Sequence, residues 1–230
     1  MSIDCIIKLG GSLLYDFPKT KKLLKEIYDN KSGNLAVSVG SGALGEIYKE
    51  FITQLGNDEI TFNNSVRDFS SLQSINASII AALNENYKIC ETKEEVEECM
   101  KEEKIAILDT RGFIGVFKND KFQKGDVRAA NLCNYFDCHN LIVITNVDGV
   151  YDQDPNENNN AHIIEKITSE NLKKMGRTSV DNGLAERIED YNLTCYVIGI
   201  NSLLNNKGNI NNTLPTGTKI ERSEKVYEKV

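Results

Sequence analysis

The chain has 230 residues, a length that suits one α/β domain or two small lobes, and its contents of 40% hydrophobic and 27% charged residues are ordinary for a soluble globular protein. Its net charge of −7 argues against a sequence-independent nucleic-acid-binding protein, which needs a basic surface. No apolar run approaches the roughly 18 residues of a membrane span. The N-terminus lacks a signal-peptide pattern, and the six cysteines include no C-x-x-C pair, so we expect a reduced, cytoplasmic protein without a membrane or nucleic-acid partner.

The first predicted strand covers residues 3–9 and ends beside a glycine turn. Lys8 stands at the end of this strand, and Gly10, Gly11 and Ser12 follow it. Glycines let the backbone approach a ligand and present its N–H groups, and a lysine adds a positive charge. This combination suits a transferring phosphate. A lysine at a strand edge followed by an ordinary turn is the alternative. The pattern GxxxxGK[ST] is absent, so a P-loop is not predicted.

A second glycine loop, Gly40 to Gly45, stands between the predicted strand Leu35–Val39 and a helix that extends to about Leu55. The helix before this strand has an apolar face formed by Leu23, Leu24, Ile27 and Tyr28. We interpret the loop as an anion cradle at a helix N-terminus. Its GxGxxG spacing also matches a dinucleotide-binding fingerprint, and a plain tight turn is the third interpretation.

The middle of the chain is predicted to alternate helices and strands. A long helix over residues 65–83 carries an apolar stripe of Leu72, Ile75, Ile79, Ile80 and Leu83, with Asp68 and Gln73 as candidate substrate contacts on other faces. A strand at Tyr87–Cys90, a helix capped by Thr92 and a strand over residues 104–108 follow. Residues 113–117 and 121–123, joined by Asn119-Asp120, predict a hairpin.

Two further segments carry candidate site residues. Gly125-Asp126 opens a helix that should end near Cys138, and Asp126 is either a simple N-cap or a carboxylate that orients Lys8. The apolar run 141–145 predicts a strand buried on both faces. Open α/β sheets bind ligands beyond the carboxyl ends of their strands. A ligand is therefore sought first at the polar residues that follow this strand, which are Asn146, Asp148, Gly149, Tyr151 and Asp154.

The rest of the chain continues the alternation of strands and helices. We expect an extended segment over residues 163–167, a helix from Ser169 to Met175 ended by Gly176, and a helix from Thr178 to about Tyr191. Strands are expected at 193–198 and 217–220. This order predicts a layered, mostly parallel sheet.

The order of these motifs resembles that of the amino-acid kinase superfamily, which includes uridylate, acetylglutamate, carbamate and isopentenyl phosphate kinases. Residues 7–12, Ile-Lys-Leu-Gly-Gly-Ser, resemble the signature of the first strand, and residues 39–42 resemble the second glycine loop, which usually has three glycines where Ser41 interrupts them here. Residues 125–130 are similar to the D-x-x-A-A helix start, and residues 216–220 to the G-T-x-I ending. The most specific match is the nucleotide-binding segment, residues 145–155.

The resemblance implies a three-layer αβα sandwich with a mostly parallel central sheet. It implies one domain over residues 1–230, with an acceptor-binding part at about 1–138 and a nucleotide-binding part at about 139–230. It also implies phosphoryl transfer from ATP, with Mg²⁺ carried on the ATP phosphates and no metal ligand from the protein. A homo-oligomer is common in this superfamily and is expected here.

The resemblance also implies roles for individual residues. Lys8 would bridge the transferring phosphoryl group, and Asp126 would orient this lysine. The nucleotide contacts would be Gly10, Ser12, Thr145, Asn146, Asp148, Gly149, Tyr151 and Asp154. The acceptor and phosphate contacts would be Gly11, Gly40, Ser41 and Gly42.

The acceptor stays open at this stage. Archaeal uridylate kinases and an archaeal kinase of aminomethylfuran phosphate resemble the chain, but both usually carry a Thr-Thr-Asp or Thr-Ser-Asp loop where Lys124-Gly125-Asp126 stands. The second lysine that acetylglutamate kinases place near Asp181 is missing, and Arg128 or Arg177 could supply its charge. We expect a phosphate monoester as acceptor. The alternatives are a non-catalytic nucleotide-binding or storage protein, a kinase of amino-acid carboxylates, and a dinucleotide enzyme.

Overall fold

The computed structural model describes residues 2–55, 59–118, 124–155, 157–158, 160–176, 178–210 and 216–223. Within these ranges eight strands form one sheet in the order β3-β4-β2-β1-β5-β7-β8-β6. The strands are β1 (Cys5–Leu9), β2 (Leu35–Val39), β3 (Tyr87–Cys90), β4 (Ile105–Leu108), β5 (Asn140–Thr145), β6 (Lys166–Thr168), β7 (Thr194–Gly199) and β8 (Thr218–Glu221). Neighbouring strands are parallel except β7 and β8, which pair antiparallel. The predicted mostly parallel sheet is confirmed.

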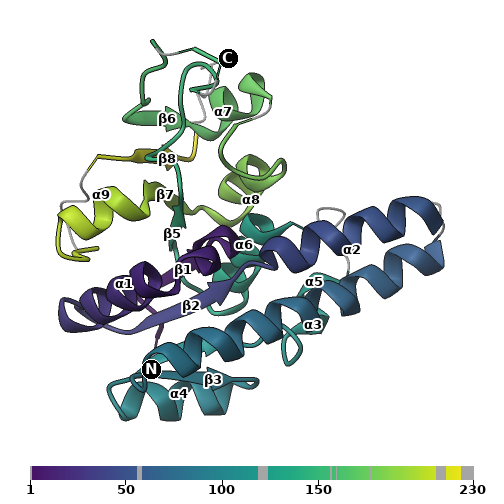
Figure 1. Ribbon diagram of the computed structural model, residues 1–230, viewed down its shortest axis with the longest axis vertical. Helices are drawn as coiled ribbons and strands as arrows, with labels where there is room; N and C mark the ends of the chain where they lie inside the picture. Colours follow the sequence, from purple (N-terminus) through teal and green to yellow (C-terminus); the bar gives the residue numbers. More distant parts are fainter. Residues whose placement is uncertain are drawn as a thin grey trace, which may run out of the picture.

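Helices connect the strands and cover both faces of the sheet (Figure 1). They are η1 (Gly11–Tyr15, a 3₁₀ helix), α1 (Phe17–Asp29), α2 (Gly42–Leu55), α3 (Glu59–Leu83), α4 (Lys93–Lys101), α5 (Ile114–Phe117), α6 (Gly125–Tyr135), α7 (Ser169–Met175), α8 (Leu184–Tyr191) and α9 (Ile200–Asn205). Figure 1 also shows α2 and α3 running side by side away from the sheet. In the described ranges, no helix combines the length and apolarity needed to cross a bilayer.

The core has two layers because successive side chains of a strand point to opposite faces. In β1, Ile6 packs into a cluster with side chains of α4, α5, α6, α7 and α8, whereas Ile7 packs into a second cluster with α1, α3 and α9. Ile6 and Ile7 are both fully buried. Burial on both faces explains why the sequence of this strand shows a continuous apolar run instead of an alternating one. The three-layer αβα architecture is therefore confirmed.

The predicted hairpin at residues 113–117 is wrong, because this segment contains helix α5. Phe113 and Phe117 are four residues apart and both buried, which a helix achieves by placing them on one face. The rings of Phe113 and Phe136 pack edge to face, with their centroids 5.4 Å apart. The other half of the predicted hairpin, residues 121–123, lies outside the described residues.

Helix α3 is longer than predicted, and its buried face is partly polar. Ile75 of the predicted apolar stripe is 51% exposed. The buried side chains of this helix include Ser70, Gln73, Ser74 and Asn76. Asn76 donates to the carbonyl oxygen of Gly40 at 2.8 Å, so this polar face supports the second glycine loop.

Ser74 of the same face contacts a buried carboxylate at the end of β4. Ser74 donates to Asp109 at 2.7 Å, and Arg111 forms a 2.9 Å ion pair with the same carboxylate. Burial alone would raise the pKa of Asp109, but the hydrogen bonds from Arg111 and Ser74 hold it below its ordinary value.

Three smaller differences concern element boundaries near the C-terminal half. The helix expected from Thr178 begins only at Leu184, and residues 178–183 form a loop. The segment expected at 163–167 contributes one isolated bridge, from Ile163 to Tyr151, before β6 begins at Lys166. Helix α9, of six residues, was not among the elements predicted from the sequence.

Candidate active site

The carboxyl ends of β1, β2, β5 and β7 meet at one edge of the sheet, since these strands are parallel neighbours. Lys8 lies near the end of β1, with its side chain 13% exposed. Its ammonium group is 2.7 Å from Oδ1 of Asp126, which lies in the first turn of α6 and is buried. The structure therefore brings together the two residues that the sequence proposed as catalytic.

A second carboxylate, Asp181, completes this cluster from the loop before α8. The backbone N–H of Asp126 donates to Oδ2 of Asp181 at 2.9 Å. In return, the backbone N–H of Asp181 donates to Oδ2 of Asp126, also at 2.9 Å. This reciprocal pair joins two segments that are 55 residues apart in the sequence, and it fixes both carboxylates around Lys8.

The electrostatics of the cluster favour a protonated lysine. Burial alone would lower the pKa of Lys8, but the charge of Asp126 and its hydrogen bond reverse the effect and raise that pKa. Burial and the neighbouring charge of Asp126 raise the pKa of Asp181. Lys8 therefore keeps its positive charge at neutral pH, as the neutralisation of phosphate oxygens requires.

The two glycine loops touch each other backbone to backbone. A Cβ atom on Gly11 would overlap the backbone nitrogen of Gly42, and a Cβ atom on Gly40 would lie 2.9 Å from the nitrogen of Gly11. Gly42 has φ +54°, which disfavours a side chain there as well. These close approaches bring a helix N-terminus, that of α2, next to Lys8 and form a cradle of the kind that binds phosphate.

The loop after β5 is fixed by hydrogen bonds to three other segments. Ser12 donates to Oδ1 of Asn146 at 2.6 Å, which joins this loop to the first glycine turn. Asp148 accepts a hydrogen bond from Ser202 of α9 at 2.7 Å. The backbone N–H of Val150 donates to the hydroxyl of Thr218 in β8 at 2.8 Å.

The rest of this loop runs antiparallel to the segment that precedes β6. Ser179 donates to the carbonyl oxygen of Gly149 at 2.9 Å. Tyr151 forms the antiparallel bridge to Ile163, and Asp154 is exposed. The loop thus connects the first glycine turn at one end to β8 and the segment before β6 at the other.

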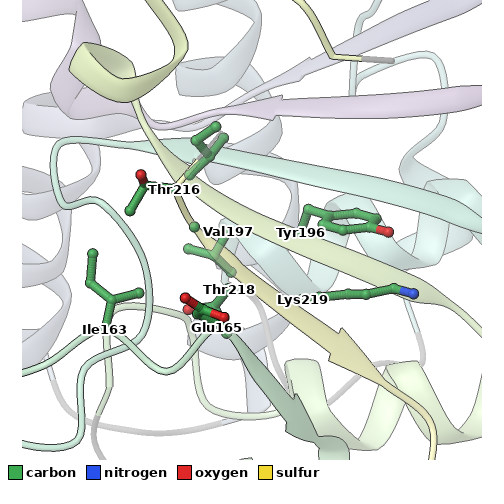
Figure 2. A pocket seen from close by; sticks show the side chains of 9 residues that line it. Ile163, Glu165, Tyr196, Val197, Thr216, Thr218 and Lys219 are labelled. Carbon is green, nitrogen blue, oxygen red and sulfur yellow. The ribbon is translucent and has the colours of Figure 1, made fainter. Parts of the chain in front are cut away.

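Two cavities lie along this part of the molecule. The first has a volume of about 280 Å³. Of the residues proposed from the sequence, it is lined by Lys8, Gly10, Gly11, Ser12, Gly40, Ser41, Gly42 and Thr145. The second, of about 400 Å³, lies between β7, β8 and the segment that precedes β6, and Figure 2 shows Thr216, Thr218, Tyr196 and Lys219 around it. Asp148, Gly149, Tyr151 and Asp154 line neither cavity.

The structure adds residues to the first cavity that the sequence did not single out as site residues. They are Tyr15, Ala43, Glu46, Lys49, Phe69, Lys124, Gly125 and Asp181, together with Gln73, which was only a candidate contact. For Asp181, the available signal was its place near the position where acetylglutamate kinases carry a second lysine. For Lys124, the signal was its departure from the threonine that archaeal uridylate kinases usually carry there.

The side chain of Arg128 has its partners on α3 and α5. Arg128 is buried and donates a hydrogen bond to Ser70 of α3. Its guanidinium carbon lies 4.2 Å from the ring centroid of Phe117. Burial lowers its pKa to about 9. It therefore packs between α3 and α5 and does not supply the missing charge beside Asp181. Arg177, the other candidate, lies outside the described residues.

Comparisons with known proteins agree with this geometry. The sequence pattern of the amino acid kinase family matches residues 5–199. The chain belongs to the amino acid kinase family. It is 30% identical over 184 residues to a uridylate kinase of Thermococcus sibiricus, covering 76% of each chain. It is 28% identical over 213 residues to a uridylate kinase of Thermococcus kodakarensis, covering 84% of this chain and 89% of the relative.

A solved structure shows the same fold. The uridylate kinase from Archaeoglobus fulgidus superposes with a TM-score of 0.69 at 22% identity, over 95% of this chain and 100% of that one. The family resemblance expected from the sequence is confirmed, and with it an ATP-dependent phosphotransferase.

Proposed function

We propose that the protein transfers the γ-phosphoryl group of ATP to the phosphate of a small phosphate monoester. Two of the relatives it resembles are named uridylate kinases, and uridylate is such a monoester. The observation that carries this proposal is Lys8, which Asp126 holds at 2.7 Å beside two contacting glycine loops. Phosphoryl transfer depends mainly on positioning and on neutralising charge, and this site offers both.

In the proposed reaction, an oxygen of the acceptor phosphate forms a bond to the γ-phosphorus of ATP. The bond from that phosphorus to the β–γ bridging oxygen breaks, and ADP leaves with the electron pair. Lys8 contacts the oxygens of the transferring group, while Asp126 and Asp181 hold Lys8 in place. The N–H groups at Gly11, Ser41 and Gly42 donate to the phosphates on the acceptor side, while the N–H of Gly40 donates to the carbonyl oxygen of Leu9 and holds this loop in place.

The nucleotide lies on the other side of Lys8 in this proposal. Gly10, Ser12, Thr145 and Asn146 bind the ATP phosphates, and Asp148, Gly149, Tyr151 and Asp154 shape the loop against the nucleoside. We assign the cavity beside Thr218 to the nucleoside, because Thr218 fixes this loop at Val150. The acceptor part is then residues 1–138 and the nucleotide part residues 139–230.

Mg²⁺ would reach the site on the ATP phosphates and supply further neutralisation of their charge. Among the described side chains, no group of three or more His, Cys, Asp or Glu residues is arranged to hold a metal ion by itself. The glycine cradle and Lys8 suit a phosphate chain, which is the group that would carry the ion. A homo-oligomer and a cytoplasmic location stay predictions.

The test is a screen of ATP consumption with purified protein and Mg²⁺ over UMP, other nucleoside monophosphates, isopentenyl phosphate, aminomethylfuran phosphate, and aspartate or glutamate. ADP formation with at least one phosphate monoester is expected. Turnover only with an amino acid would replace the proposal with a carboxylate kinase. ATP binding without turnover of any acceptor would favour a non-catalytic nucleotide-binding protein.

A further inference from the structure

We propose that Lys124 is the acceptor-binding cation of this protein, contacting the phosphate of the phosphate monoester while Lys8 serves the transferring group. This inference rests on the proposed function and deepens it. It concerns the position where the chain departs from the kinases it resembles.

Lys124 occupies the N-cap position of α6, immediately before Gly125. Its backbone is extended, and its carbonyl oxygen accepts a 2.9 Å hydrogen bond from the N–H of Arg128, which fixes the start of the helix. The residue is exposed and lines the 280 Å³ cavity together with Gly40 and Gly42. A ligand in that cavity can therefore reach Lys124 without rearrangement of the helix.

The position of Lys124 relative to Lys8 is set by the glycine between it and Asp126. A Cβ atom at Gly125 would lie 3.3 Å from Cε of Lys8, so the stem of Lys8 runs against this glycine. The chain thus places one lysine on the sheet, against Gly125, and a second lysine immediately before Gly125 at the start of the helix. Two cations in one cavity can contact two phosphates that approach each other.

The charge balance of the site calls for a second cation. Lys8, Asp126 and Asp181 together carry one net negative charge when all three are ionised. A site of that charge would repel two phosphates, which must come together for transfer. Lys124 brings the cluster to neutrality, and its charge acts on Asp181 in the direction that lowers the pKa of that carboxyl group.

The other charged pair of the cavity does not change this balance. Glu46 and Lys49, both on α2, form an ion pair of 2.6 Å and neutralise each other. Arg128 packs against Phe117 and Ser70. Among the charged residues that the structure places in this cavity, Lys124 is therefore the cation best placed to bind an added anion.

The inference is tested with Lys124→Met, which removes the charge but keeps the length of the side chain, and with Lys124→Arg, which keeps the charge. Lys101→Ala, an exposed lysine on α4, is the matched control. Steady-state kinetics are measured with UMP, or with the monoester that the screen identifies. Isothermal titration compares binding of that monoester with its dephosphorylated form.

Loss of one charge-assisted contact should raise the KM for the acceptor about 10- to 100-fold in Lys124→Met, with the KM for ATP changed by less than about twofold. Lys124→Met should also lose most of the preference for the monoester over its dephosphorylated form. Lys124→Arg should recover most of the affinity, and all variants should keep the melting temperature of the wild type.

An unchanged acceptor KM in Lys124→Met, or an equal rise in both KM values, would overturn the assignment of Lys124 while leaving the kinase proposal intact. A wild-type protein that turns over no phosphate monoester would overturn the proposed function, and this inference with it.

Discussion

Replacing Lys8 by methionine removes the positive charge between Asp126 and Asp181 while keeping a side chain of similar length. At 2.7 Å, the attraction between Lys8 and Asp126 amounts to about 6 kcal/mol at an effective dielectric constant of about 20. Desolvation of both groups offsets part of this gross energy. Breaking a buried pair costs about 3–5 kcal/mol, and the 13% exposure of Lys8 places the expected loss of unfolding free energy near the lower end.

The loss of activity should exceed the loss of stability. Lys8→Met should lower kcat by at least about 10²–10³-fold, because a preorganised charge aimed at the transferring group is removed. ADP release in a coupled assay gives the activity, and urea unfolding gives the stability. The protein must still be folded under the conditions of the assay, which circular dichroism would verify.

The double variant Lys8→Met/Asp126→Asn separates the two effects. The neutral amide that Asp126→Asn introduces can still accept the hydrogen bond from the N–H of Asp181. The double variant should therefore recover about 2 kcal/mol of unfolding free energy relative to Lys8→Met. It should recover no activity. A Lys8→Met protein within tenfold of wild-type kcat would refute the role of Lys8, and equal stability of the single and double variants would refute the coupling.

Three further changes test other parts of the structure. Gly11→Ala should lower the rate of ADP release by about 100-fold or more in a folded protein, because the added Cβ would displace Gly42. Gly115→Ala is the control and should have no effect on ADP release, because its Cβ meets no atom within 4 Å. Thr218→Val should leave a buried loop N–H without its acceptor, cost about 1–3 kcal/mol in urea unfolding and raise the KM for ATP. Asp109→Asn should lower the melting temperature at pH 7, since the pKa of Asp109 is held below its ordinary value.

The pH dependence of the Asp109→Asn effect follows from the direction in which the fold shifts the pKa of Asp109, which is downward. A carboxylate with a lowered folded-state pKa stabilises the fold above its unfolded pKa, which is about 3.9, and this contribution is lost as the pH falls further. The difference in melting temperature between wild type and Asp109→Asn should therefore shrink below about pH 4. A constant difference from pH 3 to pH 7 would contradict this reasoning. Normal kinetics in Gly11→Ala would contradict the predicted effect of the Gly11–Gly42 contact on activity. An unchanged KM for ATP in Thr218→Val would contradict the predicted effect of the Thr218 hydrogen bond on ATP binding.

Local sequence was sufficient for the strands and for the cradle. The runs at Leu35–Val39 and 141–145 are apolar throughout because both faces of these strands are buried, and such runs are recognisable without knowing their neighbours. The glycines that follow β1 and β2 mark close backbone approaches, which only glycine permits at Gly11 and Gly42.

Local sequence failed where a distant contact decides between two local structures. The spacing of Phe113 and Phe117 fits both an alternating strand and one face of a helix. The helix forms because Phe113 packs on Phe136 and Phe117 packs under the guanidinium of Arg128. In α3, Ile75 belongs to an apolar helical pattern and is nevertheless exposed, because the polar face with Ser74 and Asn76 is bound to Asp109 and the Gly40 loop.

The sequence by itself indicated the eight described strands of the sheet, the glycine turns, and the pairing of Lys8 with Asp126 that the family resemblance implied, but it missed helices α5 and α9. Only the tertiary structure placed Asp181 in reciprocal hydrogen bonds with Asp126, and only it showed Lys124 lining the 280 Å³ cavity with Lys8 while Arg128 packs on Phe117. The physical reason is that turns and strands are encoded by neighbouring residues. A charge cluster depends instead on segments that meet only after parallel strands bring their carboxyl ends to one edge.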